Sequence, residues 1–475
     1  MFNYQVNLVD PANAGGSADG VLVYDLQQAL SEWSKYISGQ GTIIAELRIA
    51  TTAEGRESGG PTSTFFVGAQ GARNVFESSA EYELATGKHV TGTSSDIIIT
   101  VDPRYFNQLS LQGGLTAESP VEAGRYNPIS VFMHEIGHGL GVISYYSDAG
   151  VLPSSYESNY DALIQFSGGH PYFTGSTAKS VYGAPVPVTD NTMQENFSHF
   201  GTTISDLNVS GPSSVTDPLT LDLLNGIVLF HNYNYQISDL DLGVLRDLGF
   251  SSGRPLVGTS GDDVLHVSTI VNSVNAGAGN DVIFIDGVGA RFIDGGDGLD
   301  AVIFPGPKSA FSISVASSTV SNAGIGVQTL ANVERLQFSD TTLALDIQGD
   351  AGSAYRLYQA AFNRTPDTPG LSFWTHQLDH GIDIQAVAAG FVNSSEFQSV
   401  YGVNPTHPHI VDLLYHNVLG RNGETAGTNY WIGQLDRGVS VGEVLQGFAV
   451  SSENHGIVDP KIAQGITLDH TAFLV

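Results

Sequence analysis

Two histidines spaced four residues apart have the clearest chemistry in this sequence. His134 and His138 lie in the string HEIGH, inside the apolar stretch 130–144. On a helix, residues four apart lie on one face, so both imidazoles can bind the same metal ion. Glu135 lies next to them and can act as a general base toward a metal-bound water. The pattern therefore predicts a zinc site that activates water, with a pair of hydrogen-bonded histidines in a buried helix as the alternative.

A catalytic zinc needs a third protein ligand and an open fourth position for water. Gly141 follows the histidines at the spacing H-E-x-x-H-x-x-G. This string resembles the metzincin clan of zinc endopeptidases, in which that glycine turns the chain sharply after the active-site helix. The commonest metzincin spacing has a third histidine at the position where this sequence has Ser144. The third ligand must therefore lie elsewhere in the chain.

One branch of the clan, the leishmanolysin-like proteases, inserts a long segment before its third histidine. Here a long insertion is followed by ENFSHFG (195–201) and then by LDLLNG (221–226). That order resembles the late histidine of the branch followed by its methionine-containing turn. The resemblance covers about residues 1–250 and implies that His199 is the third zinc ligand. It also puts Leu224 where the family has methionine, a substitution of similar volume.

Other side chains could supply the third ligand, and the sequence leaves them open. Glu157 or Glu195 would make the site similar to that of the gluzincins instead. The remaining alternatives are Asp148, Asp161, His170 and His231. Tyr233 could assist near the turn or be an ordinary half-buried aromatic side chain.

The chemistry expected of this site is hydrolysis of a peptide bond. Zinc lowers the pKa of its bound water and polarises the scissile carbonyl, while Glu135 accepts the proton and later delivers it to the leaving amine. The run SSDIIITV (94–101) resembles the edge strand with which the clan binds a peptide by antiparallel pairing. A plain core strand accounts for the same run equally well.

Three glycine-rich segments after residue 255 could bind calcium. They match or nearly match the nonapeptide G-G-x-G-x-D-x-U-x, and their sixth residues are Asp263, Asp281 and Asp300. They resemble the RTX repeats of proteins exported by type I secretion systems, including the serralysin proteases. The separations of 18 and 19 residues (263 to 281, 281 to 300) correspond to two nonapeptides per turn of a β-roll. We therefore expect one row with about two calcium ions, with a metal-free β-solenoid as the alternative.

A second repeat, with a period of 57 residues, occupies 353–456. LYQAAFNR (357–364) aligns with LYHNVLGR (414–421) without a gap, and Trp374 aligns with Trp431. Apolar residues recur at helical spacing in both copies, which predicts two small helical units. They resemble a bacterial module of unknown function found in tandem on secreted and surface proteins. The tryptophans could contact a cell-surface polymer, although core positions within helices also account for them.

The elements that must position the metal site belong to a mixed α/β unit. Apolar spacing predicts a helix from Leu22 to near Gly39, a helix after Pro128 and a last helix over 238–248. The stretch 151–220, rich in Ser, Pro, Gly and Tyr, is expected to be a long irregular insertion. Runs of β-forming residues bounded by Gly, Ser and Pro predict strands at 42–49, 64–67, 74–84 and 96–101.

Composition and charge exclude several kinds of partner and chemistry. With 18 Lys plus Arg against 48 Asp plus Glu, the net charge is −30, which argues against nucleic acid and anionic membrane surfaces. The absence of cysteine excludes disulfides, thiolate ligands and a cysteine nucleophile. No apolar run is long enough to predict a membrane-spanning helix. The N-terminus lacks the features of a cleavable secretory signal, whereas the terminal HTAFLV resembles uncleaved type I export signals.

Together these features predict a multidomain α+β protein. The expected domains are a metzincin-like zinc protease domain (1–250), an RTX-type calcium-binding β-roll with flanking strands (255–350) and a tandem helical module with a C-terminal tail (353–475). The expected function is that of a secreted or cell-surface-associated zinc endopeptidase acting on proteins or peptides, with Zn²⁺ and Ca²⁺ as its metals. The competing hypothesis is a surface-binding or structural protein with an inactive protease-like domain. Ser144 and Leu224 favour that alternative.

Overall fold

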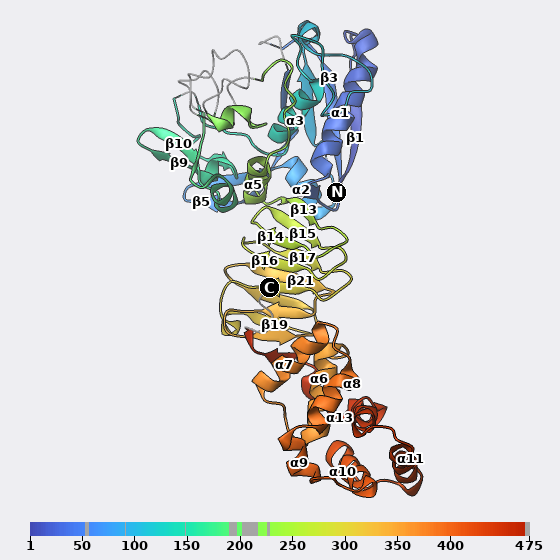
Figure 1. Ribbon diagram of the computed structural model, residues 1–475. Helices are drawn as coiled ribbons and strands as arrows, with labels where there is room; N and C mark the ends of the chain where they lie inside the picture. The colour runs from blue at the N-terminus through green and yellow to red at the C-terminus, as the bar shows by residue number, and fades with distance from the viewer. Residues whose placement is uncertain are drawn as a thin grey trace. The chain divides into compact units, whose positions relative to one another are not determined.

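The protein has a mixed α+β architecture with several sheets and a C-terminal helical module (Figure 1). The computed structural model describes residues 1–52, 57–90, 92–147, 149–189, 197–201, 217–225 and 229–470. The chain divides into two compact units, Met1–Arg254 and Pro255–Val475. Among the described residues, no helix combines the length and apolarity needed to cross a membrane.

A four-stranded sheet forms the centre of the first unit. Its strands, in spatial order, are β1 (Asn3–Val9), β3 (Thr42–Ile49), β7 (Ile97–Val101) and β4 (Glu57–Pro61). The first three strands run parallel, whereas β4 pairs antiparallel with β7. Strand β3 has the bounds that the sequence predicts. Strand β7 pairs on both sides, so of the two interpretations of 94–101 the core strand is confirmed and the edge strand is wrong. Strand β4 lies at that edge of the described sheet.

Two helices pack together in this unit. Helix α1 (Asp19–Ser34) buries Leu22, Leu26 and Trp33 completely. The Trp33 indole nitrogen donates to the Met133 carbonyl of α3 (Pro128–Gly139) at 2.9 Å. Helix α1 ends before Gly39 because the following residues form a short strand, β2 (Ile37–Ser38), which pairs with β12 (Ser251–Ser252).

The predicted strand over 74–84 is only half right. Strand β6 (Arg73–Ser78) pairs with β5 (Thr64–Gln70), but the chain then enters helix α2 (Ser79–Thr86). The Ser78 hydroxyl caps this helix by accepting from the Glu81 amide at 3.1 Å. Gly87, with φ of 70°, ends the helix. A cap and a glycine stop therefore override the β-forming residues between them.

The stretch 151–220 is more regular than expected. Gly168 and Gly169, both with positive φ, make the turn that joins β9 to β10 in a hairpin. The Asp247 carboxylate on α5 (Asp239–Asp247) accepts two amides from the first turn of helix α4, at 2.9 and 2.8 Å. The described elements here are β8 (Tyr156–Ser158), β9 (Ile164–Ser167), β10 (His170–Phe173), α4 (Ser176–Tyr182) and β11 (Val186–Pro187).

Two six-stranded sheets form the first part of the second unit, and apolar side chains from both form one core. One sheet contains, in order, β13 (Arg254–Val257), β15 (Val271–Asn275), β17 (Arg291–Asp294), β21 (Gly326–Ala331), β20 (Thr319–Asn322) and β19 (Ser312–Ser314). The other contains β14 (Val264–Val267), β16 (Val282–Ile285), β18 (Ala301–Ile303), β22 (Arg335–Gln337), β23 (Thr342–Ala344) and β24 (Ile466–Leu468). Strands β14, β16, β18 and β22 pair in parallel, as do β15, β17 and β21. From β13 to β18, successive strands thus alternate between the two sheets.

Eight helices follow, four from each repeat. They are α6 (Asp350–Phe362), α7 (Thr368–Asp379), α8 (Ile384–Val392), α9 (Ser395–Tyr401), α10 (His407–Leu419), α11 (Thr425–Asp436), α12 (Val441–Ala449) and α13 (Ser452–Ile462). Each helix of the second copy begins 57 residues after its counterpart (350 and 407, 368 and 425, 384 and 441, 395 and 452). The prediction of two equivalent helical units is confirmed.

Packing explains the paired tryptophans of the repeat. Trp374 lies against Gly390, where an added Cβ would be 2.7 Å from the ring, and Trp431 has the same relation to Gly447 at 2.6 Å. Both rings are partly buried and pack against the helical core. These contacts favour a structural role for the tryptophans over polymer binding.

After the last helix, the chain adds strand β24 to the sheet that contains β23. Strand β24 pairs antiparallel with β23, so 466–468 belong to the β-structure rather than to the tail of the helical domain. Arg335 on β22 is buried and forms ion pairs with Asp346 and, at 2.7 Å, with Asp379 at the end of α7. These ion pairs connect β22 and the residues after β23 to helix α7 of the first repeat.

Candidate metal centre

The helix that carries the HEIGH string is defined by its ends. Asn127 caps it by accepting the Ile129 amide at 2.9 Å, and Pro128 occupies the first position. Every residue of α3 is buried. Gly141 adopts φ of +122° directly after the helix, which only glycine does without strain. The sharp turn expected from the sequence is therefore present.

Three imidazole nitrogens converge above this helix. The Nε2 atoms of His134 and His138 lie 3.2 Å apart, and those of His138 and His199 lie 3.0 Å apart. The third side of the triangle, between His199 and His134, is 3.3 Å. Nitrogens bound tetrahedrally to zinc at about 2.0–2.1 Å would be about 3.3 Å from one another. The geometry fits a zinc ion held by three histidines, each no more than 9% exposed.

Hydrogen bonds fix which ring nitrogens face the shared point. The Nδ1 of His134 donates to the Leu223 carbonyl and the Nδ1 of His138 donates to the Val142 carbonyl, both at 2.7 Å. A carbonyl can only accept, so these protons lie on Nδ1 and the Nε2 lone pairs point at each other. Burial lowers the pKa of His138 and so favours the neutral ring. Lone pairs this close repel unless a cation lies between them.

The segment Leu223–Leu224 contacts both His134 on α3 and the residue that follows His199. Leu223 supplies the carbonyl for His134, and the Leu224 carbonyl accepts the Phe200 amide at 3.0 Å, next to His199. The Leu224 side chain is fully buried beneath the helix, where a Cβ on Gly137 would lie 2.4 Å from its Cδ2. Leu224 thus packs under the helix that carries His134 and His138.

Ser144 has a positioning role. Its amide donates to the Ser198 hydroxyl at 2.9 Å, and its own hydroxyl donates to Asp161 at 2.6 Å. Because Ser198 precedes His199, Ser144 holds the ligand segment from the position where the compact motif would have its own ligand.

Two buried carboxyl groups support the Leu223–Leu224 segment. Asp222 is hydrogen-bonded to Asp241 on α5, and both accept hydrogen bonds from Ser238. Burial, with the neighbouring charge of Asp222 as the next cause, raises the pKa of Asp241 far above its ordinary range. Asp241 therefore holds a proton and donates it to Asp222.

The competing third ligands that the structure describes lie outside the converging group. His170 and His231 are exposed, and the His231 ring packs on Tyr126 at 4.1 Å between centroids. Asp161 accepts hydrogen bonds from Ser144 and the Tyr145 amide. The other expected residues are placed as follows: Glu157 is buried but does not join the three histidines, Tyr233 packs edge-to-face on Tyr235, and Asp148 and Glu195 lie outside the described residues.

The general-base candidate lies where the helix packs against the edge strand β4. Glu135 is 7% exposed. Strand β4 passes so close to it that a Cβ on Gly59 would lie 2.5 Å from the Glu135 carbonyl oxygen. Only a glycine at this position lets the strand approach the helix. The sequence does not predict β4, because Glu57–Pro61 contains two glycines and a proline and has no β-forming pattern.

The three aspartates of the glycine-rich repeats form one ladder. The Asp263 amide donates to Asp281 Oδ1 at 2.8 Å, and the Asp281 amide donates to Asp300 Oδ1 at 2.9 Å. Glu334 continues the series by accepting the Asp300 amide at 2.9 Å. The Oδ2 atoms of Asp281 and Asp300 are buried and accept no hydrogen bond among the described residues. Burial raises the pKa of Asp300 to about 6 and so disfavours its charged form.

Glycine is required in this ladder because successive turns touch. A Cβ on Gly277 would lie 1.9 Å from the Thr259 carbonyl oxygen, and one on Gly296 would lie 1.8 Å from that of Gly277. Both glycines have positive φ, 112° and 98°. The turns therefore stack backbone on backbone, which directs carbonyl oxygens and carboxylates to the same side as the spacing predicts.

Comparison with known proteins identifies one part of the chain. The family model of a domain of unknown function (DUF4214) matches residues 350–398 and 388–458. The two matches cover the two helical copies. No curated protein matches the chain.

Replacing His199 tests the ligand set. We expect His199→Ala to retain one zinc equivalent fewer than the wild type, because two imidazoles alone bind zinc weakly. His170→Ala and His231→Ala are matched controls that keep the full content. Metal analysis after desalting measures the count. Unchanged zinc in His199→Ala would refute the assignment.

The shared proton makes stability depend on pH. A carboxyl whose pKa is raised by folding stabilises the protein fully below the ordinary value of about 4, and this contribution is lost as the pH rises through the folded pKa. The free energy of unfolding should therefore fall as the pH rises. We expect Asp241→Asn to reduce this fall by up to about 1.4 kcal/mol per pH unit, because an asparagine amide is neutral in both the folded and the unfolded protein. Hydrogen exchange of peptides from 1–254 between pH 5 and pH 8 measures the free energy of unfolding of the first unit at each pH. The exposed Asp239→Asn is the control, and equal slopes in wild type and Asp241→Asn would contradict the account.

Proposed function

We propose that the first unit is a zinc-dependent endopeptidase domain. The observation that carries the proposal is the convergence of three buried Nε2 atoms, two of which come from the helix that also carries Glu135. Both histidines of the helix are held by carbonyls, so they are positioned before any metal binds. A buried, preorganised three-histidine group with a neighbouring carboxylate suits hydrolysis better than structural metal binding, which usually closes the fourth position with a protein ligand.

The histidines, Glu135 and strand β4 have different roles in the proposed hydrolysis of a peptide bond. Zinc bound by the histidines would supply a Lewis acid that polarises a carbonyl and acidifies water. Glu135 takes the proton from the attacking water and returns it to the leaving amine. Strand β4 has a free edge in the described sheet and passes over Glu135, so an extended peptide can pair with it next to the base. The proposed substrate is therefore an unfolded or extended protein segment.

The second unit supports a proposal of calcium-dependent export. The ladder of Asp263, Asp281 and Asp300 carries two buried oxygens without hydrogen bonds among the described residues, as expected of a repeat that binds calcium. Stacked carboxylates repel at low calcium, so the strands lack the cation that would stabilise them. We therefore propose that the protein is secreted by a type I system, stays unfolded in this region inside the cell and folds when it meets calcium outside.

Removing the base separates the enzyme from a binding protein with an inactive domain. We expect Glu135→Ala to lose about 10²- to 10⁴-fold in casein cleavage while its zinc content stays unchanged, because the base is not a metal ligand. Glu118→Ala, at an exposed glutamate, is the control. Equal cleavage by Glu135→Ala and wild type, or no cleavage by either, would favour the surface-binding alternative.

Calcium removal tests the second proposal. We expect EGTA to expose the strands after residue 255 to limited proteolysis in the full chain, whereas 1–254 changes less, because binding free energy appears as folding free energy. Asp281→Ala should raise the calcium midpoint more than Asp263→Ala or Asp300→Ala, since Asp281 lies between the other two. The full chain is needed because β24 completes the sheet. Identical digestion with EGTA and with millimolar calcium would contradict the proposal.

A further inference from the structure

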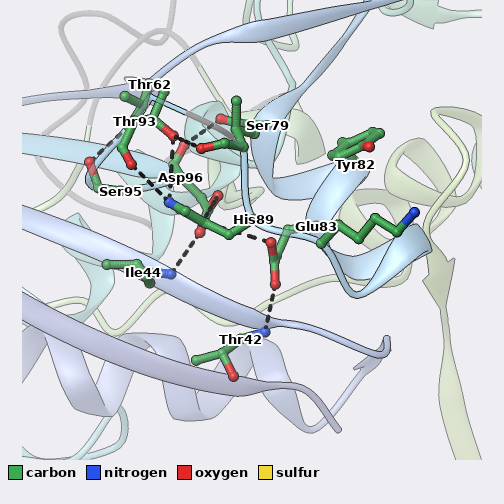
Figure 2. A network of polar contacts seen from close by, with 12 residues as sticks. Thr42, Ile44, Thr62, Ser79, Tyr82, Glu83, His89, Thr93, Ser95 and Asp96 are labelled. Carbon is green, nitrogen blue, oxygen red and sulfur yellow. Dashed lines mark hydrogen bonds and ion pairs between the residues drawn. The ribbon is translucent and has the colours of Figure 1, made fainter.

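A second group of metal-binding side chains lies in the first unit, apart from the histidine triad. Glu83 lies on α2 and is 4% exposed, and Asp96 lies just before β7 and is fully buried. His89 lies in the turn that joins the two elements (Figure 2). One ligand atom from each of the three residues lies within 4.8 Å of the others. No sequence pattern reveals this group, because the three residues belong to no motif.

Each of these side chains has one atom fixed and another directed at the shared point. Glu83 Oε1 accepts the Thr42 amide at 3.1 Å, and Asp96 Oδ2 accepts the Ile44 amide at 2.9 Å. His89 Nε2 donates to the Thr93 carbonyl at 3.1 Å, and Figure 2 shows these contacts around the ring. Because a carbonyl can only accept, Nε2 carries the proton. The atoms left for a ligand are Glu83 Oε2, Asp96 Oδ1 and His89 Nδ1.

The two remaining carboxylate oxygens are costly as they stand. Glu83 Oε2 and Asp96 Oδ1 are buried and accept no hydrogen bond among the described residues. They lie 3.7 and 3.2 Å from His89 Nδ1. Burial removes the hydration of both oxygens, His89 is a charged partner for them only when it is protonated, and two neighbouring carboxylates also repel. The arrangement needs a positive charge at its centre.

We propose that Glu83, His89 and Asp96 bind a zinc ion. An imidazole nitrogen with two carboxylate oxygens is a ligand set that zinc accepts, whereas calcium and magnesium prefer oxygen alone. The separations from His89 Nδ1 are close to the roughly 3.3 Å between ligands of tetrahedral zinc. The His89 side chain is 31% exposed, so the ion can enter from solvent and keep a water as its fourth ligand. The hydrogen bonds to Thr42, Ile44 and Thr93 are the outer contacts that orient such ligands.

The role of this ion is structural. Its ligands would join α2 to the start of β7, and their second atoms already bind the first residues of β3. Strands β3 and β7 are neighbours in the central sheet, and α3 packs on β7 where a Cβ on Gly139 would lie 2.5 Å from Ile97. The ion would therefore fasten His89 to the sheet on which the histidine helix rests. The proposal stands independently of peptidase activity.

Another histidine offers a matched control. His266 forms an ion pair with Asp286 at 2.6 Å, and the two side chains are 63% and 50% exposed. His266 contacts one exposed carboxylate, whereas His89 contacts two buried ones. We therefore expect His266 to retain no zinc.

Zinc counts on the full chain decide between a metal site and a metal-free ion pair. Wild type, His89→Ala, His266→Ala, the double variant His134→Ala/His138→Ala and that double variant with His89→Ala are loaded with zinc in millimolar calcium, desalted and analysed for metal. We expect His89→Ala to remove one zinc equivalent from the wild type and from the double variant, while His266→Ala removes none. Failure of the peptidase assignment would appear separately, as a double variant with the same zinc content as wild type.

A protonated His89 held between two carboxylates, with no metal, is the outcome that overturns the proposal. It predicts equal zinc content with and without His89. Should His89→Ala fail to fold, cobalt titration of the double variant with His89 intact replaces it. Intense tetrahedral cobalt absorption at one equivalent supports the site, and the weak spectrum of solvated cobalt refutes it.

Discussion

The approach of three imidazole Nε2 atoms to within 3.3 Å of one another is the constraint on which the first unit depends. Two of the rings donate their only proton to backbone carbonyls, so neither can relieve the contact by hydrogen bonding to the other. Such an arrangement suits a cation shared by the three rings. The rest of the unit holds these rings in place.

That structure draws on distant parts of the chain. The Leu223–Leu224 segment binds His134 on one side and the residue after His199 on the other, and the Asp222–Asp241 pair holds the segment to α5. Gly137 and Gly59 let Leu224 and β4 approach α3 more closely than any larger residue would allow. In the second unit, glycines allow successive turns to stack, and the aspartates of these turns then form a ladder.

The sequence predicts features that depend on short-range patterns. The H-E-x-x-H helix, β3, the capped helix at Ser238 and the period of 57 residues are all found where local spacing puts them. The aspartate ladder also follows from spacing alone. His199 is different, because no local pattern marks it and only the order of motifs in a resembling family points to it.

Features set by tertiary contact cannot be predicted in this way. Strand β4 is defined by its pairing with β7 and not by β-forming residues, so the sequence leaves open whether 94–101 lies at the edge of the sheet or inside it. The support given by Ser144 and the group of Glu83, His89 and Asp96 depend on side chains that meet only in the folded chain. Glu334 extends the aspartate ladder from outside the nonapeptides, and only the pairing of β18 with β22 brings it there.

Anomalous diffraction at the zinc edge from crystals of the full chain is the most direct test of the central claim. The account predicts a zinc peak about 2.0–2.1 Å from the Nε2 atoms of His134, His138 and His199. A zinc peak with His199 more than about 4 Å away, or no peak between these histidines in zinc-loaded crystals, would contradict it.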